Sequence, residues 1–222
     1  MIDKVLFQEI KKFSKKIKNK KILDFGSGDQ RYKKFFIKNN TYYSLDVKKS
    51  GYKRIKKNNF IIDGEKKKKL PIKKSFFDII ICTEVLEHVI YLEFLIKEFK
   101  RILKKNGSIL VTTPFVWAEH DTPYDFRRFT SYGIKKIFLE NNFKIIKYKK
   151  LVCGNKALIT VFHSQLNRLF YNYYRKDNKL ILVLIKIYFN FIKIIIVYFF
   201  KLFVPENYQN NFYIDNFLII KK

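Results

Sequence analysis

Acidic residues stand where four short apolar runs of this chain end. Asp24 closes KILDF and Asp46 closes SLDV, while Asp63 follows FII and Glu84 follows IIICT. A carboxylate accepts hydrogen bonds from hydroxyl and amino groups and attracts cations. Asp46 comes 22 residues after Asp24, a distance that suits a carboxylate accepting from ribose hydroxyls, and Asp63 could receive an adenine amino group.

A glycine turn follows the first of these acids. Gly26 and Gly28 let the backbone approach a ligand closely. A dinucleotide site would usually continue as GxGxxG, but here the run is GSGDQR, with Gln30 near the place of a third glycine. Asp29 adds a negative charge that disfavours a pyrophosphate. The turn therefore favours a ligand with a cationic centre and an amino group.

Reactive side chains gather in WAEHDTPYDFRRFT, residues 117–130. His120 with the adjacent Asp121 is the preferred general base, and His88 is a second catalytic candidate. Tyr124, Arg127 and Arg128 are candidate substrate-binding residues, since guanidinium groups grip phosphates or carboxylates.

The same loop has a structural alternative. It could be a lid in which Arg127 or Arg128 pairs with Asp125 or Asp121. His163 is expected to be structural, and because no residues have metal-ligand spacing we expect no metal.

Strands and helices must alternate to bring these residues together. We expect strands at 20–25, 41–47, 60–63, 75–84, 108–115 and 144–152, and helices at 30–39, 84–107 (capped by Gly107) and 131–143. This order predicts an α/β fold with a doubly wound, mostly parallel sheet, in which the carboxyl ends of the strands share one edge. The expected divisions are an N-terminal helix at 1–20, a core at 21–152, an apolar helical insertion at 153–211, and a last strand at 212–222 that returns to the core.

The insertion reads as two long apolar helices within 155–204. Residues 180–204 could span a bilayer by length, yet Lys186, Lys193 and Lys201 fall with Asn190 on one narrow stripe. A helix lying in the membrane interface fits this pattern better than a span. The alternative is packing against its own domain or at a homodimer interface.

Composition limits the remaining classes. The net charge of +28 suggests a nucleic-acid or membrane partner, but only seven of the 47 basic residues are Arg, and A/T-rich codons would explain the excess of Lys. Cys82 and Cys153 have no paired spacing and favour a reduced cytoplasmic setting. The N-terminus lacks the apolar core of a signal peptide.

The motifs LDFGSGDQRY, SLDV, IIDGE, FFDIIICTEVLEHV and LKKNGSILVTTPF, in this order, resemble the class I S-adenosylmethionine-dependent methyltransferases. The resemblance covers residues 20–150 and implies a seven-stranded Rossmann-like sheet. It assigns the cofactor turn to Asp24, Gly26 and Gly28, the ribose to Asp46, the adenine to Asp63, and the methionine part to Glu84. The expected cofactor contacts also include Ser27, Val47 and Gly64.

The resemblance implies transfer of a methyl group to a small molecule or a glycan. A lipid-linked or surface-polysaccharide sugar would suit an enzyme peripheral to the inner membrane face. One alternative is an RNA or DNA methyltransferase, although no NPPY-like motif or added nucleic-acid domain is evident, and we expect no nucleic-acid partner. The other is a non-catalytic module that keeps the fold and tethers partners at the membrane.

Overall fold

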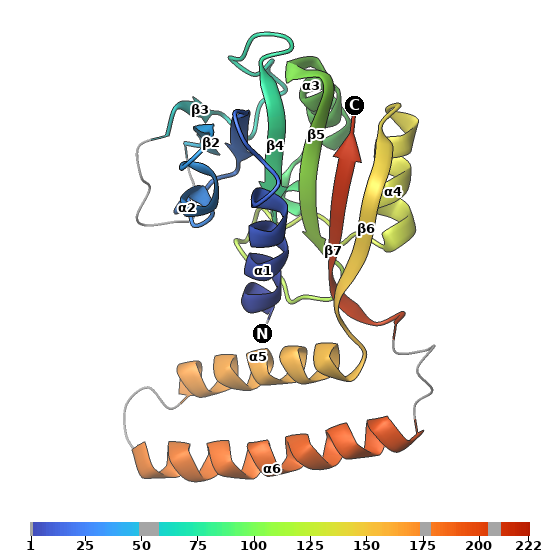
Figure 1. The fold of residues 1–222 in the computed structure, drawn as a ribbon. Helices are drawn as coiled ribbons and strands as arrows, with labels where there is room; N and C mark the ends of the chain where they lie inside the picture. Colours follow the sequence, from blue (N-terminus) through green and yellow to red (C-terminus); the bar gives the residue numbers. More distant parts are fainter. Residues whose placement is uncertain (1, 49–57, 174–178, 204–209) are drawn as a thin grey trace. The chain divides into compact units, whose positions relative to one another are not determined.

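Figure 1 shows a computed structural model of the chain, which describes residues 2–48, 58–173, 179–203 and 210–222. The chain divides into two compact units, which are described separately. The core unit is Asp3–Leu151 with Asp215–Lys222, and the helical unit is Val152–Ile214 with the first two residues.

The core unit is built on one seven-stranded sheet. Its strand order is β3-β2-β1-β4-β5-β7-β6, and the pairs from β3 to β5 are parallel. The strands are β1 (Lys21–Phe25), β2 (Thr41–Val47), β3 (Phe60–Ile62), β4 (Phe77–Thr83), β5 (Leu103–Pro114), β6 (Lys144–Cys153) and β7 (Tyr213–Lys221). The predicted doubly wound, mostly parallel sheet is confirmed.

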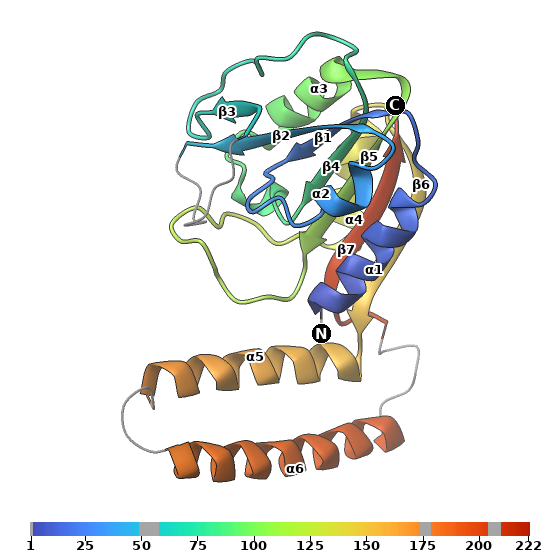
Figure 2. The same ribbon diagram turned by 60° about the vertical axis from the view of Figure 1, so that its left-hand side comes forward.

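Helices cover both faces of this sheet. α3 (Leu92–Ile102) and α4 (Ser131–Glu140) lie on one face, and α1 (Ile2–Ser14) and the four-residue α2 (Lys33–Phe36) lie on the other (Figures 1 and 2). The helix expected over residues 30–39 is thus much shorter than predicted. α4 begins where the Thr130 side chain accepts a hydrogen bond from the Gly133 N–H, which caps the first turn.

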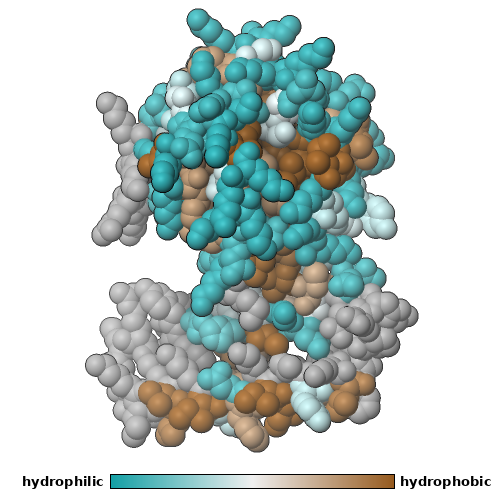
Figure 3. All heavy atoms as spheres, in the orientation of Figure 1, coloured by the Kyte–Doolittle hydropathy of each residue, from teal (hydrophilic) through white to brown (hydrophobic). Residues whose placement is uncertain are grey.

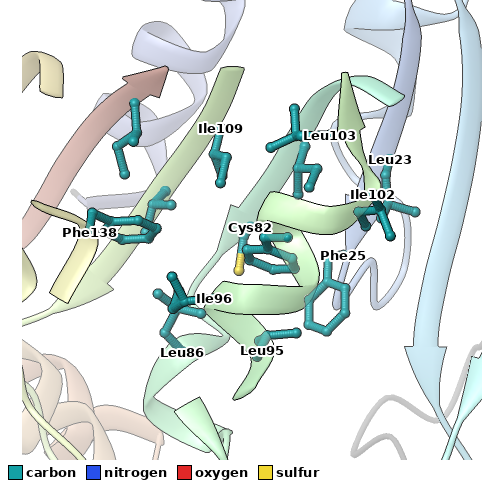
Figure 4. Close-up of a cluster of buried hydrophobic side chains, with 14 of the residues drawn as sticks. Leu23, Phe25, Cys82, Leu86, Leu95, Ile96, Ile102, Leu103, Ile109 and Phe138 are labelled. Atoms are coloured by element: carbon teal, nitrogen blue, oxygen red, sulfur yellow. The ribbon is translucent and has the colours of Figure 1, made fainter. Parts of the chain in front are cut away.

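The main hydrophobic core lies between the sheet and the helices α3 and α4. Figure 4 shows Cys82 of β4 and Ile96 of α3 in this cluster, with Phe138 of α4 beside them. The centre of β4 is apolar on both faces because helices cover the two sides of the sheet. This packing fixes β4 and β5, whose carboxyl ends carry the candidate site.

The segment after β4 differs from its prediction. Instead of one helix over 84–107, the chain forms a 3₁₀ turn, η1 (Leu86–His88), followed by α3. His88 therefore belongs to the turn and does not begin the helix. Gly107 is not a helix cap but lies within β5, where a Cβ atom would meet Leu103 Cδ2 at 2.4 Å. The glycine permits a close approach to the start of β5, which the sequence pattern did not separate from a cap.

The last strand returns to the sheet, as the sequence predicts. β7 runs antiparallel to β5, with Ser108 opposite Lys221 and Pro114 opposite Asp215. The buried Asn216 of β7 donates from Nδ2 to the Phe129 carbonyl at 2.7 Å. β7 thereby anchors the end of the loop that follows β5.

The helical unit contains two helices, α5 (Asn155–Tyr173) and α6 (Lys179–Phe203), lying side by side. The rings of Phe162 and Phe189 join them, with centroids 6.1 Å apart. Residues 174–178 and 204–209 of the predicted insertion lie outside the described residues, as do the side chains of Lys186, Lys193 and Lys201. Among the helices described, none has both the length and the apolar character needed to cross a membrane.

An apolar stripe is exposed along α6 (Figure 3). Each member is more than half exposed and recurs at helical spacing: Val183, Leu184, Ile187, Tyr188, Phe191, Ile194, Ile195, Tyr198, Phe199 and Leu202. We call this set the α6 stripe. Large exposed apolar patches of this kind mark surfaces that meet a partner or a membrane.

Candidate active site

The parallel strands carry three acids to one edge of the sheet. Asp24 lies opposite Ser44 of β2 and Ile81 of β4, and Asp46 lies one residue before the end of β2. Glu84 follows directly after β4. Parallel pairing places the carboxyl ends of these strands together, where ligands of open α/β sheets bind.

The turn after β1 has the backbone that a close ligand approach requires. Gly26 and Gly28 have φ values of +68° and +50°, and Gln30 has a φ of +57°. Gln30 thus adopts the left-handed conformation although it is not a glycine. The turn therefore forms without the third glycine of the GxGxxG pattern. Gln30 Nε2 donates to the Ser44 hydroxyl at 3.3 Å and to Asn58 Oδ1 at 3.2 Å, and these bonds hold the turn against β2.

The Asp46 side chain holds the glycine turn through a hydrogen bond to its backbone. Its carboxylate accepts from the Gly28 N–H at 2.7 Å and from the Val47 N–H at 2.8 Å. Burial raises the pKa of Asp46, although both hydrogen bonds work against this rise. Each carboxylate oxygen keeps a further lone pair. The expected role toward ribose hydroxyls therefore remains open to Asp46.

Asp24 is buried in β1, two residues before the turn begins at Gly26. The Tyr42 hydroxyl donates to its carboxylate. Burial raises the pKa of Asp24 to about 7, outweighing that hydrogen bond, and the nearby Asp46 and Asp29 add to the rise. Tyr42 was not among the expected site residues. Its place in the strand predicted at 41–47, which pairs with the strand that carries Asp24, is the signal that could have identified it.

Glu84 occupies a strained position at the end of β4, with a φ of +52°. Its Oε1 accepts from the Thr112 hydroxyl of β5 at 2.6 Å. Burial raises the pKa of Glu84 to about 7 despite that bond. A positive φ at a non-glycine residue is uncommon and is frequently found at functional sites.

The other expected cofactor residues contact neighbouring parts of the chain. Asp63 follows the edge strand β3, where it pairs with Lys66 at 3.3 Å and accepts from the Glu65 N–H at 3.1 Å. Gly64 lies against Val47, whose Cγ1 would be 2.9 Å from an added Cβ. The Ser27 hydroxyl donates to Asn58 Oδ1 at 2.9 Å. The roles predicted for these residues stay predictions.

The loop after β5 is organised around Asp125. Arg128 donates to both of its oxygens, at 2.6 and 2.7 Å, and the His120 N–H donates at 2.9 Å. Burial alone would raise the pKa of Asp125, but these bonds lower it to about 2. His120 Nδ1 is 3.2 Å from Asp125 Oδ2. The carboxylate that orients His120 is therefore Asp125 and not the predicted Asp121, which is exposed.

The arginines of this loop have internal partners. Arg127 donates to the carbonyls of Val89 and Ile90, and Arg128 also reaches the carbonyls of Trp117 and Ala118. The pair of Arg128 with Asp125 matches the structural alternative for this loop, and the grip of the arginines on a substrate anion stays a prediction. The Tyr124 hydroxyl donates to Glu65 at 2.9 Å, so its substrate role also stays a prediction.

The two histidines expected near the site come together. The rings of His88 and His120 meet edge to face, with centroids 4.9 Å apart. Glu87, which the sequence reasoning left out, is fully buried beside them. His163, by contrast, lies on α5 and contacts Asn167 at 3.0 Å within that helix.

Comparison with known proteins decides the family of this fold. A model of the methyltransferase domain matches residues 2–148. The chain belongs to the methyltransferase domain family. An uncharacterized protein of Methanocaldococcus jannaschii is 38% identical over 112 residues, covering 49% of this chain and 48% of that protein. The ubiquinone biosynthesis O-methyltransferase of Pelagibacter ubique is 32% identical over 111 residues, covering 47% and 46%.

The chain spans about half the length of those two curated relatives in its matches. A solved SAM-dependent methyltransferase of Archaeoglobus fulgidus is similar with a TM-score of 0.61, covering 99% of this chain and 94% of that one. At 12% identity this likeness shows the fold. The matched family supports S-adenosylmethionine as the cofactor, as the sequence implied.

The residues at the acidic edge fit this cofactor. Asp24 and Glu84 are buried carboxyls whose pKa values are raised to about 7, so a nearby positive charge would favour their ionised forms. A sulfonium and an ammonium group supply such charge. The left-handed glycine turn leaves backbone close to the edge without side chains at Gly26 and Gly28.

Proposed function

We propose that this methyltransferase acts on a hydroxyl group of a small molecule or glycan, and that a lipid-linked sugar is the acceptor. The observation that carries the proposal is the juxtaposition of an acidic cofactor edge with the His120 loop, which follows the neighbouring strand β5. A hydroxyl acceptor must lose a proton during transfer. This loop provides an imidazole at the edge of the sheet where the carboxyl ends of the parallel strands lie.

The chain's residues divide this work between binding and proton transfer. The bound cofactor supplies a methyl group already activated by the sulfonium charge, so alignment is the main requirement. Asp46 and the glycine turn orient the ligand, and Asp24 and Glu84 balance its charge. His120 Nδ1 donates to the Ala118 carbonyl and lies 3.2 Å from Asp125 Oδ2, which leaves Nε2 to interact with the acceptor.

The α6 stripe supports an acceptor carried by a lipid. Ten apolar side chains on one helix face are more than half exposed, and such a face binds the boundary between headgroups and acyl chains. A peripheral position at the inner membrane face would bring the enzyme to lipid-linked sugars. A homodimer through the same stripe is the competing use of this surface.

A labelling experiment tests the acceptor class. The full chain is incubated with S-adenosylmethionine carrying a tritiated methyl group, together with separate lipid and RNA fractions of the host cell. We expect label in the lipid fraction that mild acid converts to water-soluble sugar. Label in RNA would contradict the proposal and support the nucleic-acid alternative. No label in any fraction, from a chain that binds the cofactor, would support the non-catalytic module.

A further inference from the structure

A buried carboxylate in the active-site region has no hydrogen-bond partner. Glu87 is fully buried, and both of its oxygens lack a partner. Within the described residues, the nearest basic nitrogen is His88 Nε2, 3.8 Å from Glu87 Oε1, which is too long for a hydrogen bond. An unpaired buried carboxylate is strongly unfavourable, so this site requires either a proton or a cation.

The hydrogen bonding of His88 directs a lone pair toward this carboxylate. His88 Nδ1 is 2.8 Å from the Tyr124 carbonyl oxygen. Because a carbonyl only accepts, Nδ1 carries the proton, and in the neutral ring Nε2 then presents a lone pair to Glu87. Metal-binding histidines are commonly fixed in this way, with the second nitrogen donating to a backbone carbonyl.

His120 is held by the same kind of contact. Its Nδ1 is 3.2 Å from the Ala118 carbonyl and 3.2 Å from Asp125 Oδ2, both of which are acceptors. Asp125 is itself fixed by Arg128. Both imidazoles thus have one nitrogen engaged by an acceptor and the other available as a ligand.

We propose that Glu87, His88 and His120 bind a divalent transition-metal ion such as Zn²⁺. One ligand atom of each residue lies within 4.8 Å of the others. Around tetrahedral zinc, with bonds of about 2.1 Å, ligand atoms are about 3.4 Å apart, so binding draws them together by little more than about 1 Å. Two imidazoles and one carboxylate form a ligand set that occurs in catalytic zinc and iron sites.

This site runs against the expectation of no metal that sequence spacing gave. Glu87 and His88 are consecutive, and His120 follows 32 residues later, so no local motif identifies them. The fold brings them together because η1 follows β4 and the His120 loop follows the paired strand β5.

A bound cation would change the role of His120. Three protein ligands leave a tetrahedral ion one open position, which an acceptor hydroxyl can occupy. A hydroxyl at that position would have a lower pKa and would release its proton to solvent, and His120 would then serve as a ligand and not as the base. This consequence rests on the proposed function, but the metal site does not.

Metal binding by the full chain tests the proposal. Protein without a polyhistidine tag is stripped with a chelator and titrated calorimetrically with Zn²⁺, Mn²⁺ and Mg²⁺, and metal content is measured after dialysis. We expect one equivalent of Zn²⁺ or Mn²⁺ and a higher melting temperature when it is bound. Glu87→Gln and His120→Gln should each weaken binding at least tenfold, while His163→Gln should bind as the parent does.

Two controls keep the outcome unambiguous. Glu87→Gln must melt cooperatively and still bind S-adenosylmethionine, which separates loss of the metal site from loss of fold or of the proposed function. Stoichiometric binding that Glu87→Gln and His163→Gln share equally would overturn the proposal. So would a wild-type chain that binds Mg²⁺ alone or no metal at all.

Discussion

Asp24 and Glu84 are the residues on which recognition of the cofactor's charge depends. Burial raises both pKa values to about 7, compared with 3.8 and 4.5 for ordinary Asp and Glu. The folded, unliganded protein therefore retains protons that the unfolded chain releases above about pH 4. The stability contributed by these groups falls as the pH rises toward 7.

Cofactor binding should show the opposite trend. A cationic ligand favours ionised carboxylates, so affinity for S-adenosylmethionine should rise between pH 5.5 and 7.5, by at most about tenfold per pH unit for each group. Calorimetry at several pH values measures this slope, and Asp24→Asn should flatten it. An affinity that is constant or falls over this range would refute the assigned protonation states.

At the residue scale, some features of the site could be predicted from the sequence and others could not. The common edge of Asp24, Asp46 and Glu84 could be predicted because strand termini of a parallel sheet share an edge, whatever the side-chain details. The partner of His120 was assigned to Asp121 by adjacency, but the loop turns at Asp121, which has a φ of +49°, and Asp125 occupies the inside. Glu87 was not predicted, because nothing in the neighbouring sequence indicates that its side chain is buried without a hydrogen-bond partner.

At the scale of elements, the cofactor turn depends on packing between two connections. Gly26 follows β1 and Val85 follows β4, and an added Cβ at Gly26 would meet Val85 Cγ2 at 2.3 Å. The turn after β1 therefore fits only while its first glycine has no side chain. Both this close approach and the left-handed backbone, with a φ of +68°, require a glycine at position 26.

Gly26→Ala should destabilise the core unit and weaken cofactor binding. The left-handed backbone alone costs about 1–2 kcal/mol for a non-glycine residue, and the clash with Val85 adds to it. Adding Val85→Ala to Gly26→Ala should restore part of the loss, because it removes the clashing methyl groups. Thermal melting of the two single variants and the double variant measures the coupling. Strict additivity would show that the clash is not the cause.

Boundaries were harder to predict than elements. The run 84–107 contains apolar residues at helical spacing. Residues 84–91 nevertheless form a connection that includes a 3₁₀ turn, and α3 begins after them. Tertiary packing selects the boundary here, because the turn must bring Glu84 and His88 to the ligand edge. The return of β7 to the sheet could be predicted from the resemblance, because the last strand of that family is antiparallel in the sheet.

At the scale of the whole molecule, the α6 stripe distinguishes this chain from one that consists of the methyltransferase core alone. We predict that the full chain floats with vesicles containing anionic lipids. Replacing Ile187, Phe191 and Ile194 with Ser removes apolar area from the stripe and should abolish flotation. Tyr132→Ser, at an exposed aromatic on α4, is the matched control and should float normally.

The competing outcome of that experiment is equally specific. A chain that stays unbound to vesicles but changes from dimer to monomer on the triple substitution would assign the stripe to a homodimer. Light scattering on the same samples distinguishes the two uses of the surface.

The central claim is that the acidic edge of the core unit holds S-adenosylmethionine through Asp46 and the glycine turn. Calorimetric titration of the full chain tests it most directly, with Asp46→Ala and Asp46→Asn beside Glu140→Ala, an exposed acid on α4. We predict one equivalent bound by the wild type and by Glu140→Ala, and affinity at least tenfold weaker in both Asp46 variants, about 1.4 kcal/mol or more. A folded wild-type chain that does not bind the cofactor, or unchanged affinity in the folded Asp46 variants, would contradict the account.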